Sequence, residues 1–377
     1  MGNTFLTLQD IARKALPRLI ENLVFPNLVY RDYSKTFASH GDTIRIRKPV
    51  NLTAAEFDEE SGVSYGDMEE TAVSVTLDKL ATVDVSASAV ETAVNIDDLN
   101  RVFIEPAAAA LAEKINADGL ELYRDIPTFV GTAGTTPNAL SDLANARRQL
   151  NRQKVPTVGR VAVWDPEADA AFTQIPAIVN AEKSGKTAAL REGSIGRVMG
   201  LDNYMAQGVK TVASGNFTWG GTGATGLKVK EAVAAASSVV AVSNAASGGT
   251  LTGKVLAGDI VVLGGRHYVC TEEAAASSNM VTIKLNEAVT ASANAALTVV
   301  SSGTQNLAFH PLAFAFVTRP LYKPDGEGVM SYVTNFNGIS LRVTKGYDQK
   351  YKRSNYSMDV LYGFRTIYPE LACRVLG

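Results

Sequence analysis

One serine in the sequence has the spacing of a catalytic nucleophile. Residues 62–66 read Gly-Val-Ser-Tyr-Gly, the pattern of the elbow on which a hydrolase presents the serine that attacks an acyl group. That elbow needs a hydrophobic strand before the serine and a helix after it, whereas residues 57–60 are Phe-Asp-Glu-Glu and further acidic residues follow. A serine hydrolase that uses Ser64 with His267 or His310 therefore remains only as an alternative from another functional class.

Two glycine-rich segments imitate phosphate-binding loops. Residues 221–226 match the dinucleotide fingerprint, but that fingerprint must join a strand to a helix, and the residues that follow alternate as a strand would. Residues 185–187 match the end of a phosphate loop, but Asn180 stands where that motif has its first glycine. We expect both segments to be loops that bind no nucleotide.

The cysteines and histidines are too few to suggest metal or redox chemistry. The chain has two cysteines, Cys270 and Cys373, and three histidines, His40, His267 and His310. Neither set has metal-ligand spacing, and two cysteines make no disulfide framework. We therefore expect no catalytic residue, no metal and no cofactor, and we expect the protein not to be an enzyme.

The composition is that of a globular protein whose copies can associate. The 377 residues are 46% hydrophobic and 20% charged, a balance that argues against disorder. The formal net charge of −2 lacks the basic excess of a dedicated nucleic-acid binder, and it gives only weak repulsion between copies. We expect no signal peptide, because residues 1–14 have no cationic start followed by an apolar run. We expect no membrane helix, because no stretch of 18 residues is strongly apolar.

Two charged segments of opposite sign stand far apart in the sequence. No lysine or arginine lies between Pro49 and Asp78, where acidic residues gather, and a basic stretch near the C-terminus contains five cations against the carboxylate of Asp348. We predict that the acidic segment of one copy meets the basic segment of another, with charge guiding register and assembly rate more than affinity. Two unrelated solvated surfaces are the alternative. The candidate intersubunit residues are Glu56, Asp58, Glu59, Glu60, Glu69 and Glu70 in the acidic segment, and Arg342, Lys345, Lys350, Lys352 and Arg353 in the basic segment.

Alternating residues predict a two-stranded arm that carries the acidic segment at its tip. Residues 43–49 and 73–78 both alternate between polar and apolar side chains, as strands do. An isolated two-stranded ribbon is marginally stable in water, so we expect the arm to lie on something else.

Apolar spacing predicts two helices in the first third of the chain. Residues 7–23 have helical spacing, although Pro17 is expected to kink the helix or to begin a second piece. We interpret this segment as an arm that packs on another subunit. Residues 106–125 form a predicted helix of roughly five turns, with a narrow stripe of small residues that allows close packing on a sheet.

The middle of the chain alternates between helix, strand and loop signals. Residues 141–153 are predicted to form a helix, and residues 159–164 a short buried strand. Residues 183–200 are rich in glycine and charge, and we expect a loop there. The far side of the helix predicted at 141–153 is basic, with Arg147, Arg148, Arg152 and Lys154.

The composition shifts at about residue 210 and returns to normal after residue 305. In between, Ala, Ser, Gly and Thr fill more than half of the positions from Glu231 to Gln305, and short β-type runs recur with turn signals. This pattern predicts a small β-barrel inserted into a host domain. The expected strands are residues 239–243, 260–263, 268–271, 281–285 and 297–301.

The order of these parts resembles that of a known family. An N-terminal arm, a long hairpin, a long helix, a second helix, an α/β core, a β-barrel insertion and return strands follow one another, as in the major capsid proteins of tailed phages, which share the HK97 fold. The closing residues are similar to the P22-like coat-protein branch of that family. The segments that carry this similarity are 306–310, 314–321, 341–348, 359–363 and 368–372.

The resemblance implies an α+β fold of the HK97 type with an inserted small β-barrel. The long helix would be the spine helix of the peripheral domain, and the hairpin would be the extended loop that overlaps a neighbouring subunit. The implied parts are an N-terminal arm (1–42), the extended loop (43–86), a peripheral domain (87–153 and 338–377) with the spine helix at 106–125, an axial domain (154–209 and 306–337) and the β-barrel insertion domain (210–305).

The family also implies a function and partners. The chain would be a structural coat protein that assembles as pentamers and hexamers into an icosahedral procapsid or capsid around double-stranded DNA, with scaffolding and portal proteins and a decoration protein as further partners and no membrane. It would be made in the host cytoplasm and end in the virion. We expect a shell without covalent crosslinks, since the Lys–Asn pair that joins some relatives has no place in this sequence. An encapsulin-like compartment is the alternative, against which the P22-like insertion argues.

Overall fold

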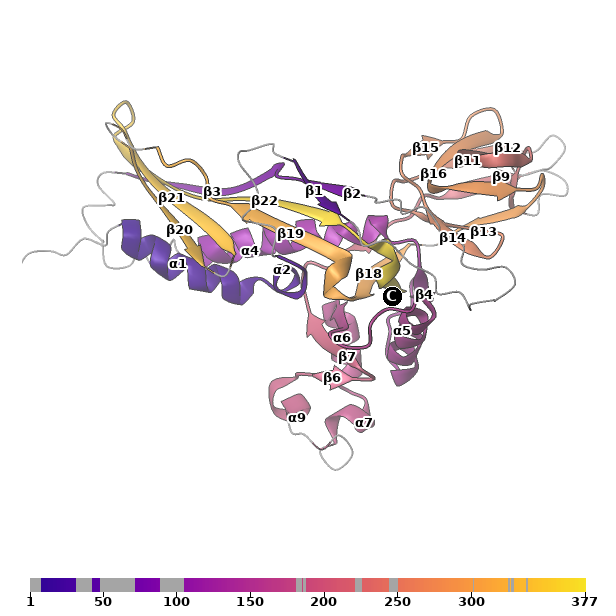
Figure 1. Cartoon of the computed structure of the whole chain (residues 1–377), viewed down its shortest axis with the longest axis horizontal. Coiled ribbons are helices and arrows are strands. Elements are labelled where there is room, and N and C mark those ends of the chain that lie inside the picture. The colour runs from indigo at the N-terminus through magenta and orange to yellow at the C-terminus, as the bar shows by residue number, and fades with distance from the viewer. Residues whose placement is uncertain are drawn as a thin grey trace, which may run out of the picture. The chain divides into compact units, whose positions relative to one another are not determined.

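The computed structural model describes residues 8–31, 43–47, 72–88, 105–180, 185, 188–220, 226–243, 250–300, 302–324, 326, 329–336 and 338–377. The chain divides into two units, each assembled from segments that are distant in sequence (Figure 1). The first unit comprises Met1–Ile20, Arg31–Leu111 and Phe314–Ile367, and the second comprises Glu21–Tyr30, Ala112–Ala313 and Tyr368–Gly377.

A five-stranded antiparallel sheet forms the body of the first unit. Strand β22 is the longest and lies in its middle. One edge of β22 pairs with β21 and, further along, with β19; the other edge pairs with β3, and β20 pairs with β21. The strands are β3 (Lys79–Ser88), β19 (Phe314–Arg319), β20 (Val329–Phe336), β21 (Ile339–Asp348) and β22 (Arg353–Thr366).

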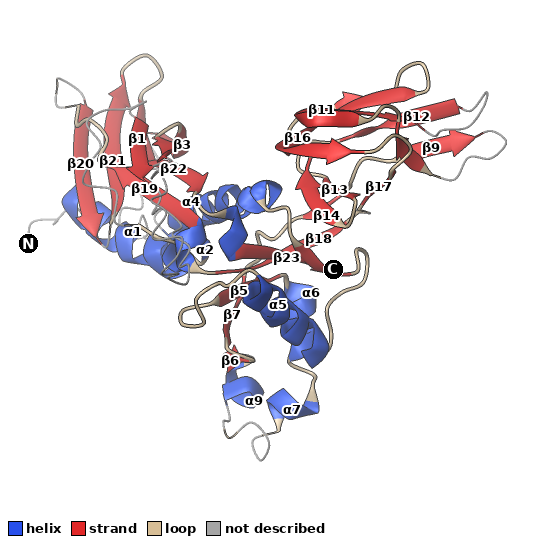
Figure 2. Ribbon diagram, turned by 45° about the vertical axis from the view of Figure 1, so that its right-hand side comes forward, coloured by secondary structure: helices blue, strands red, loops and turns tan. Residues whose placement is uncertain are grey.

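The two faces of this sheet differ as the alternation of its residues requires. Val343 and Met358 lie opposite each other in the register, and both are fully buried. Helix α1 (Leu8–Asn22) and the first half of α4 (Glu105–Leu120) lie along one face of the sheet in both ribbon views (Figure 2). An apolar face of this kind is stable only when another layer covers it.

Helix α1 belongs to the segment expected as an N-terminal arm, and the role of that arm stays a prediction. Helix α1 runs through Pro17 without beginning a second piece. Its apolar residues Ala12, Ala15, Leu16 and Leu19 are at most 2% exposed within a single copy of the chain. The apolar stripe of α1 is therefore covered by the chain itself, because its spacing of three and four residues places these side chains on one helix face.

The predicted two-stranded arm is confirmed at its base. Strands β1 (Thr43–Arg47) and β2 (Ala72–Thr76) pair antiparallel over all five residues of each. Where β2 ends, its backbone passes over β22 at Gly363, where a Cβ atom would lie 2.1 Å from the carbonyl oxygen of Thr76. Glycine is thus needed at this crossing because no side chain fits between the two backbones.

Gly363→Ala is therefore expected to lower the free energy of unfolding by about 1–3 kcal/mol, the usual cost of forcing a group into a packed site. Gly346→Ala on β21 is the matched control, since a Cβ there meets nothing within 4 Å. Urea unfolding of both variants gives the comparison. Equal midpoints for the two variants would contradict a tight crossing at Gly363.

A second sheet forms the centre of the second unit. Its strand order is β4-β23-β18-β5-β7-β6, with β8 paired to β18. Helices α5 and α6 and the short helices α7 and α9 lie beside the β5, β7 and β6 strands of this sheet (Figure 2). The elements are β4 (Phe129–Gly131), α5 (Leu140–Arg152), β5 (Val161–Trp164), α6 (Pro166–Phe172), α7 (Pro176–Val179), α9 (Ala188–Glu192), β6 (Arg197–Val198), β7 (Leu201–Met205), β8 (Thr211–Val212), β18 (Gly303–Phe309) and β23 (Ala372–Leu376).

The helix predicted at 141–153 and the strand predicted at 159–164 are confirmed as α5 and β5, with bounds within two residues. Leu143 and Leu150 of α5 and Trp164 of β5 are fully buried in one apolar cluster. The loop expected at 183–200 is wrong in part, because α9 and β6 lie within it. Those two elements are too short for a periodic pattern to emerge from five and two residues.

The predicted long helix is confirmed as α4 followed by one 3-10 segment, η2 (Glu121–Asp125). Asn116 of α4 is 8% exposed, and its side-chain amide links α4 to the segment 22–25. Its Oδ1 accepts hydrogen bonds from the backbone N–H groups of Val24 and Phe25, at 3.1 and 3.2 Å, and its Nδ2 donates to the carbonyl of Asn22. The amide thus supplies partners at the start of the short helix α2 (Phe25–Leu28), where backbone N–H groups lack them.

The inserted segment is a β-barrel, as predicted. Six strands form a sheet in the order β14-β13-β17-β10-β11-β16, and a bridge between Cys270 and Leu285 brings its two ends together. Strands β15, β12 and β9 form a smaller sheet beside it. The bounds are β9 (Phe217–Gly220), β10 (Leu227–Val229), β11 (Val233–Ser243), β12 (Thr250–Val255), β13 (Ile260–Leu263), β14 (Arg266–Val269), β15 (Ala274–Ala275), β16 (Met280–Ala291) and β17 (Ala296–Val299).

Candidate functional site

Groups that could do acid–base or nucleophilic chemistry are dispersed and engaged in packing. The ring of His267 stacks on Phe129 with centroids 4.4 Å apart, and Nδ1 of His310 accepts the backbone N–H of Leu312. Burial raises the pKa of the Cys270 thiol to about 12 and also raises that of Cys373, so both thiols stay protonated.

Within the described residues, no cluster of His, Cys, Asp or Glu could hold a metal ion. None of the described helices has the length and apolar character that a membrane span requires. Ser64 lies outside the described residues.

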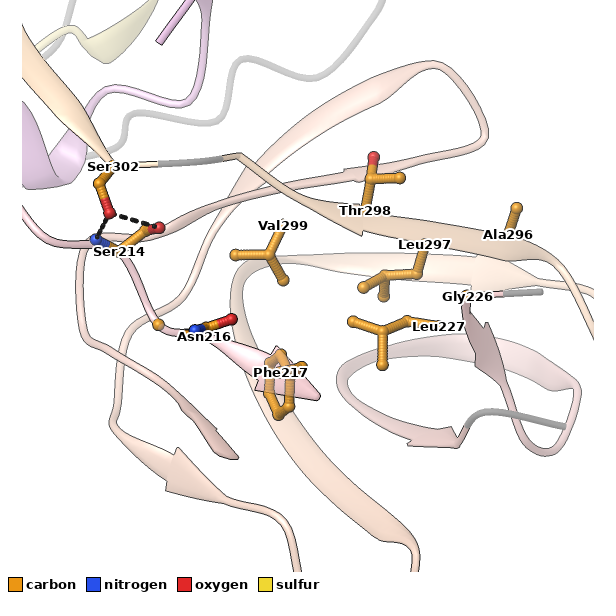
Figure 3. Close-up of a pocket in the computed structure, with 11 residues that line it drawn as sticks. Ser214, Asn216, Phe217, Gly226, Leu227, Ala296, Leu297, Thr298, Val299 and Ser302 are labelled. Carbon is orange, nitrogen blue, oxygen red and sulfur yellow. Dashed lines mark hydrogen bonds between the residues drawn. The ribbon is translucent and has the colours of Figure 1, made fainter. Parts of the chain in front are cut away.

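A pocket of about 580 Å³ opens in the barrel (Figure 3). Phe217, Leu227 and Leu297 contribute apolar side chains to it. At one end the backbone N–H of Ser214 donates to the hydroxyl of Ser302 at 3.0 Å. None of the described lining residues carries a titratable side chain, so the pocket offers no acid–base pair.

The structure describes the whole basic segment and places most of it at the turn between β21 and β22. We call Lys345, Lys350, Lys352 and Arg353 the basic turn. Lys345 and Lys350 lie over aromatic rings, with Nζ 5.3 Å from the centroid of Tyr356 and 5.2 Å from that of Tyr351. Lys352 has a left-handed backbone with φ of 51°. Such a turn holds cations at the end of a rigid sheet.

The carboxylate of Asp348, which lies next to the basic turn, accepts hydrogen bonds from the backbone. Oδ1 of Asp348 accepts the backbone N–H groups of Lys350 and Tyr351 at 2.9 and 3.3 Å. An aspartate used in this way shapes a turn, as Asx turns do. Tyr351 is 61% exposed beside these cations. The basic turn therefore combines cationic side chains with an exposed aromatic ring.

Arg342 has a different environment from the other candidate residues. Its Nε and Nη2 donate to Oδ2 of Asp359 at 2.8 and 2.6 Å. The side chain of Arg342 is 20% exposed and that of Asp359 is 4% exposed. Ser357 donates to the other carboxylate oxygen at 2.8 Å. Arg342 thus serves an internal ion pair, and only the basic turn remains as the basic half of the predicted contact.

The acidic half of the predicted contact, Glu56, Asp58, Glu59, Glu60, Glu69 and Glu70, lies outside the described residues. The structure places Lys350, Lys352 and Arg353 at the turn between β21 and β22, and Lys345 on β21 close to that turn. The intersubunit role of all of them stays a prediction.

A second basic surface lies on α5. Arg147, Arg148 and Arg152 are exposed, as is Lys154 just beyond the helix, and none of the four has an ion pair among the described residues. The carboxylate of Asp142 turns back to accept the N–H groups of Asn138 and Ala139. Burial and, secondarily, the charge of Arg152 lower the pKa of His267. The cations of this helix face are therefore not paired with carboxylates among the described residues.

Several buried polar residues escape sequence reasoning. Asp359, Arg374 and Arg160 are at most 3% exposed and each has specific hydrogen-bond partners. A charged residue within a strand of apolar residues, as in Ala-Cys-Arg-Val-Leu at β23, is the one signal the sequence offers. Such a residue is buried only when paired or hydrogen-bonded.

Comparison with known proteins supports the fold through structure rather than sequence. No protein-family model and no curated protein matches the chain. The chain is similar to the structure titled Mycobacterium phage Che8, with a TM-score of 0.54, 17% identity and coverage of 94% of this chain and 90% of that one. It is also similar to the capsid structure of the cyanophage P-SCSP1u (TM-score 0.49, 12% identity, coverage 94% and 88%) and to the mature capsid of bacteriophage PhiM1 (0.47, 10%, 94% and 86%).

The likeness to the Che8 structure extends over nearly the whole of both chains. The chain has the HK97-type fold of tailed-phage capsid proteins, with a small β-barrel inserted.

Proposed function

We propose that this protein is the major capsid protein of a tailed bacteriophage, which assembles into an icosahedral shell around double-stranded DNA. The observation that carries the proposal is the likeness to the Che8 structure over 94% of the chain. A net charge of −2 supports it further, because copies that repel each other weakly associate readily. The P22-like branch remains a prediction from the closing residues and the barrel.

The shell would be held by many modest contacts between copies. Closed symmetry repeats each contact around pentamers and hexamers, so weak interfaces sum to a stable particle. The β1–β2 hairpin would overlap a neighbouring subunit and bring the acidic segment to the basic turn. This part of the proposal rests on the exposed side chains of Lys350, Lys352 and Arg353 and on the absence of lysine and arginine between residues 49 and 78.

The proposed partners follow from assembly rather than from catalysis. Scaffolding, portal and decoration proteins would bind the shell, which forms in the host cytoplasm and becomes part of the virion. The protein would have no enzymatic activity, and its shell would lack covalent Lys–Asn crosslinks.

The exposed face of α5 is proposed to meet the packaged DNA. Arginine, asparagine and serine side chains are typical phosphate contacts, and the exposed residues of α5 include Ser141, Arg148 and Asn151, with no carboxylate among them. Contacts of this kind are independent of base sequence and depend on salt. The surface suits weak, non-specific packing of a duplex against the shell.

Replacing Arg147, Arg148 and Arg152 by glutamine is expected to weaken duplex DNA binding and to flatten its salt dependence. The slope of log K against log salt should fall by about 0.9 for each phosphate that the variant no longer neutralises. Fluorescence anisotropy with a labelled duplex at several salt concentrations measures it. The matched control replaces Lys345, Lys350 and Lys352 by glutamine, which removes the same charge elsewhere. Equal weakening in the two triple variants would show an effect of net charge and not of α5.

Light scattering coupled to size exclusion tests the proposed function in solution. A capsid protein is expected as monomer in equilibrium with species of five or six times 40.0 kDa, and with much larger shells at high concentration. The hydrolase alternative requires instead a species that turns over an ester and loses this activity on Ser64→Ala. Ester turnover by a strictly monomeric protein would overturn the proposal.

A further inference from the structure

Arg374 of β23 is a charged side chain in the interior of the second unit. It is 1% exposed. Its Nε donates to the carbonyl oxygen of Ile126 at 2.7 Å, and its Nη1 donates to that of Gly258 at 3.0 Å and to Oε1 of Gln305 at 3.5 Å. A buried cation is tolerated only when hydrogen bonds replace its hydration. These three acceptors serve Nε and Nη1 of the guanidinium, whereas Nη2 is buried without a hydrogen-bond partner among the described residues.

The acceptors come from three separate parts of the fold. Ile126 follows η2 at the end of the long helix, Gln305 lies on β18 of the host sheet, and Gly258 lies in the barrel between β12 and β13. The guanidinium also lies over the ring of Tyr123 in η2, 5.1 Å from its centroid. One side chain thus contacts the long helix, the host sheet and the inserted barrel.

The barrel loop at Gly258 is fitted closely to η2. Gly258 has φ of +94°, and a Cβ atom there would lie 2.7 Å from Cγ of Arg124. The next residue, Asp259, is 5% exposed and accepts the N–H groups of Gly215 and Leu256, both at 2.8 Å. These bonds fix the loop that presents the Gly258 carbonyl to the arginine.

The electrostatics of the site agree with this arrangement. Burial lowers the pKa of Arg374, and Tyr123, Asp125 and Asp259 act in the opposite direction. Arg374 also borders a cavity of about 20 Å³, the space of a single water molecule.

We infer that Arg374 is the positioning residue that fastens the inserted barrel to the end of the long helix and to the C-terminal strand, so that these parts open and move as one body. The inference goes beyond the proposed function and does not depend on it, because it concerns contacts within one chain. If the protein is a coat protein, the barrel follows the helix end whenever the subunit changes conformation.

Arg160 provides a matched control for a variant of Arg374. It is 2% exposed and donates to the carbonyls of Pro156 and Val155, at 2.8 and 2.5 Å, and to Oδ1 of Asn151. It therefore resembles Arg374 in burial and in its acceptors, but all of those acceptors belong to the segment around the end of α5. Arg160→Met removes a buried guanidinium without touching the barrel.

Amide hydrogen exchange of the full chain, resolved by fragment mass spectrometry, tests the inference. In Arg374→Met, amides of the barrel loop 256–259 and of η2 should exchange about ten- to a hundredfold faster, since buried hydrogen bonds to a charged group are removed. Exchange around the end of α5 should be unchanged. Arg160→Met should show the reverse pattern. Acceleration of the same segments in both variants, or an unchanged barrel in Arg374→Met, would overturn the inference.

Exchange of the unaltered protein provides a second test that needs no variant. With added denaturant, slow amides of the barrel, of η2 and of β23 should merge into one opening, as a single cooperative unit does. Separate opening of the barrel at a lower denaturant concentration than η2 and β23 would overturn the inference, even if Arg374→Met fails to fold.

Discussion

Replacement of Arg342 by methionine is expected to lower the free energy of unfolding by about 3–5 kcal/mol, because it leaves a buried carboxylate without its cation. The side chain of Asp359 is 4% exposed and accepts two hydrogen bonds from Arg342, at 2.8 and 2.6 Å. Removing one partner of such a pair costs far more than the pair itself contributes. Urea unfolding, followed by circular dichroism, measures the loss.

A double-mutant cycle separates the pair from the general effect of substitution. Arg342→Met combined with Asp359→Asn removes both charges, and the double variant should recover part of the stability that the single variant loses. Lys254→Met is the matched control, since Lys254 and Glu273 form an ion pair whose side chains are 53% and 56% exposed. That variant should change stability by less than about 1 kcal/mol. A loss of similar size for Arg342→Met would contradict the internal role assigned to Arg342.

Reversal of Glu59 and Glu60 to lysine is expected to slow shell assembly by about tenfold or more, since attraction between charged segments speeds encounter by at least that factor. Reversal of Lys350 and Lys352 to glutamate in the same chain should restore the rate, because the two segments again carry opposite charge. Time-resolved light scattering at low salt measures assembly. The difference between the wild type and the Glu59/Glu60 variant should shrink as salt is raised, because salt screens exposed charges.

The control for this reversal is a pair of glutamates with the same spacing in the barrel. Glu272 and Glu273 form exposed ion pairs with Lys284 and Lys254, and their reversal to lysine changes the net charge equally. We expect no change in the assembly rate from that control. Slow assembly in both variants, or no rescue by Lys350→Glu and Lys352→Glu, would count against contact between the acidic segment and the basic turn.

The parts of the fold that the sequence predicts are those with a regular pattern. The pairing of β1 with β2 follows from alternation, β13 follows from a short apolar run before a turn signal, and α4 and α5 follow from apolar spacing. The barrel is predicted from many short strands with turn signals, even though its strands differ in length from the expected runs. Periodicity reports which face is buried, and it does so wherever an element is several residues long.

What the sequence does not predict depends on contacts between distant residues. The apolar stripe of α1 is visible in the sequence, but whether its own chain or another subunit covers it is decided by tertiary packing. Arg342 lies among the basic residues in the sequence, but it forms an internal ion pair with Asp359, which lies opposite it in the β21–β22 register. The hydrogen-bond partners of Arg374 and Asn116 cannot be predicted from a local pattern, because they lie elsewhere in the chain. A candidate site predicted from charge alone therefore identifies a charged surface, but it does not show which of its residues make internal contacts instead.

The central claim is that copies of this chain build a closed shell. Negative-stain electron microscopy of the purified protein, expressed alone and together with a scaffolding protein, tests that claim most directly. The account predicts closed shells tens of nanometres across, or separate pentamers and hexamers, in at least one of the two preparations. A uniform 40.0 kDa monomer in both preparations, with no particles at any protein concentration, would contradict it.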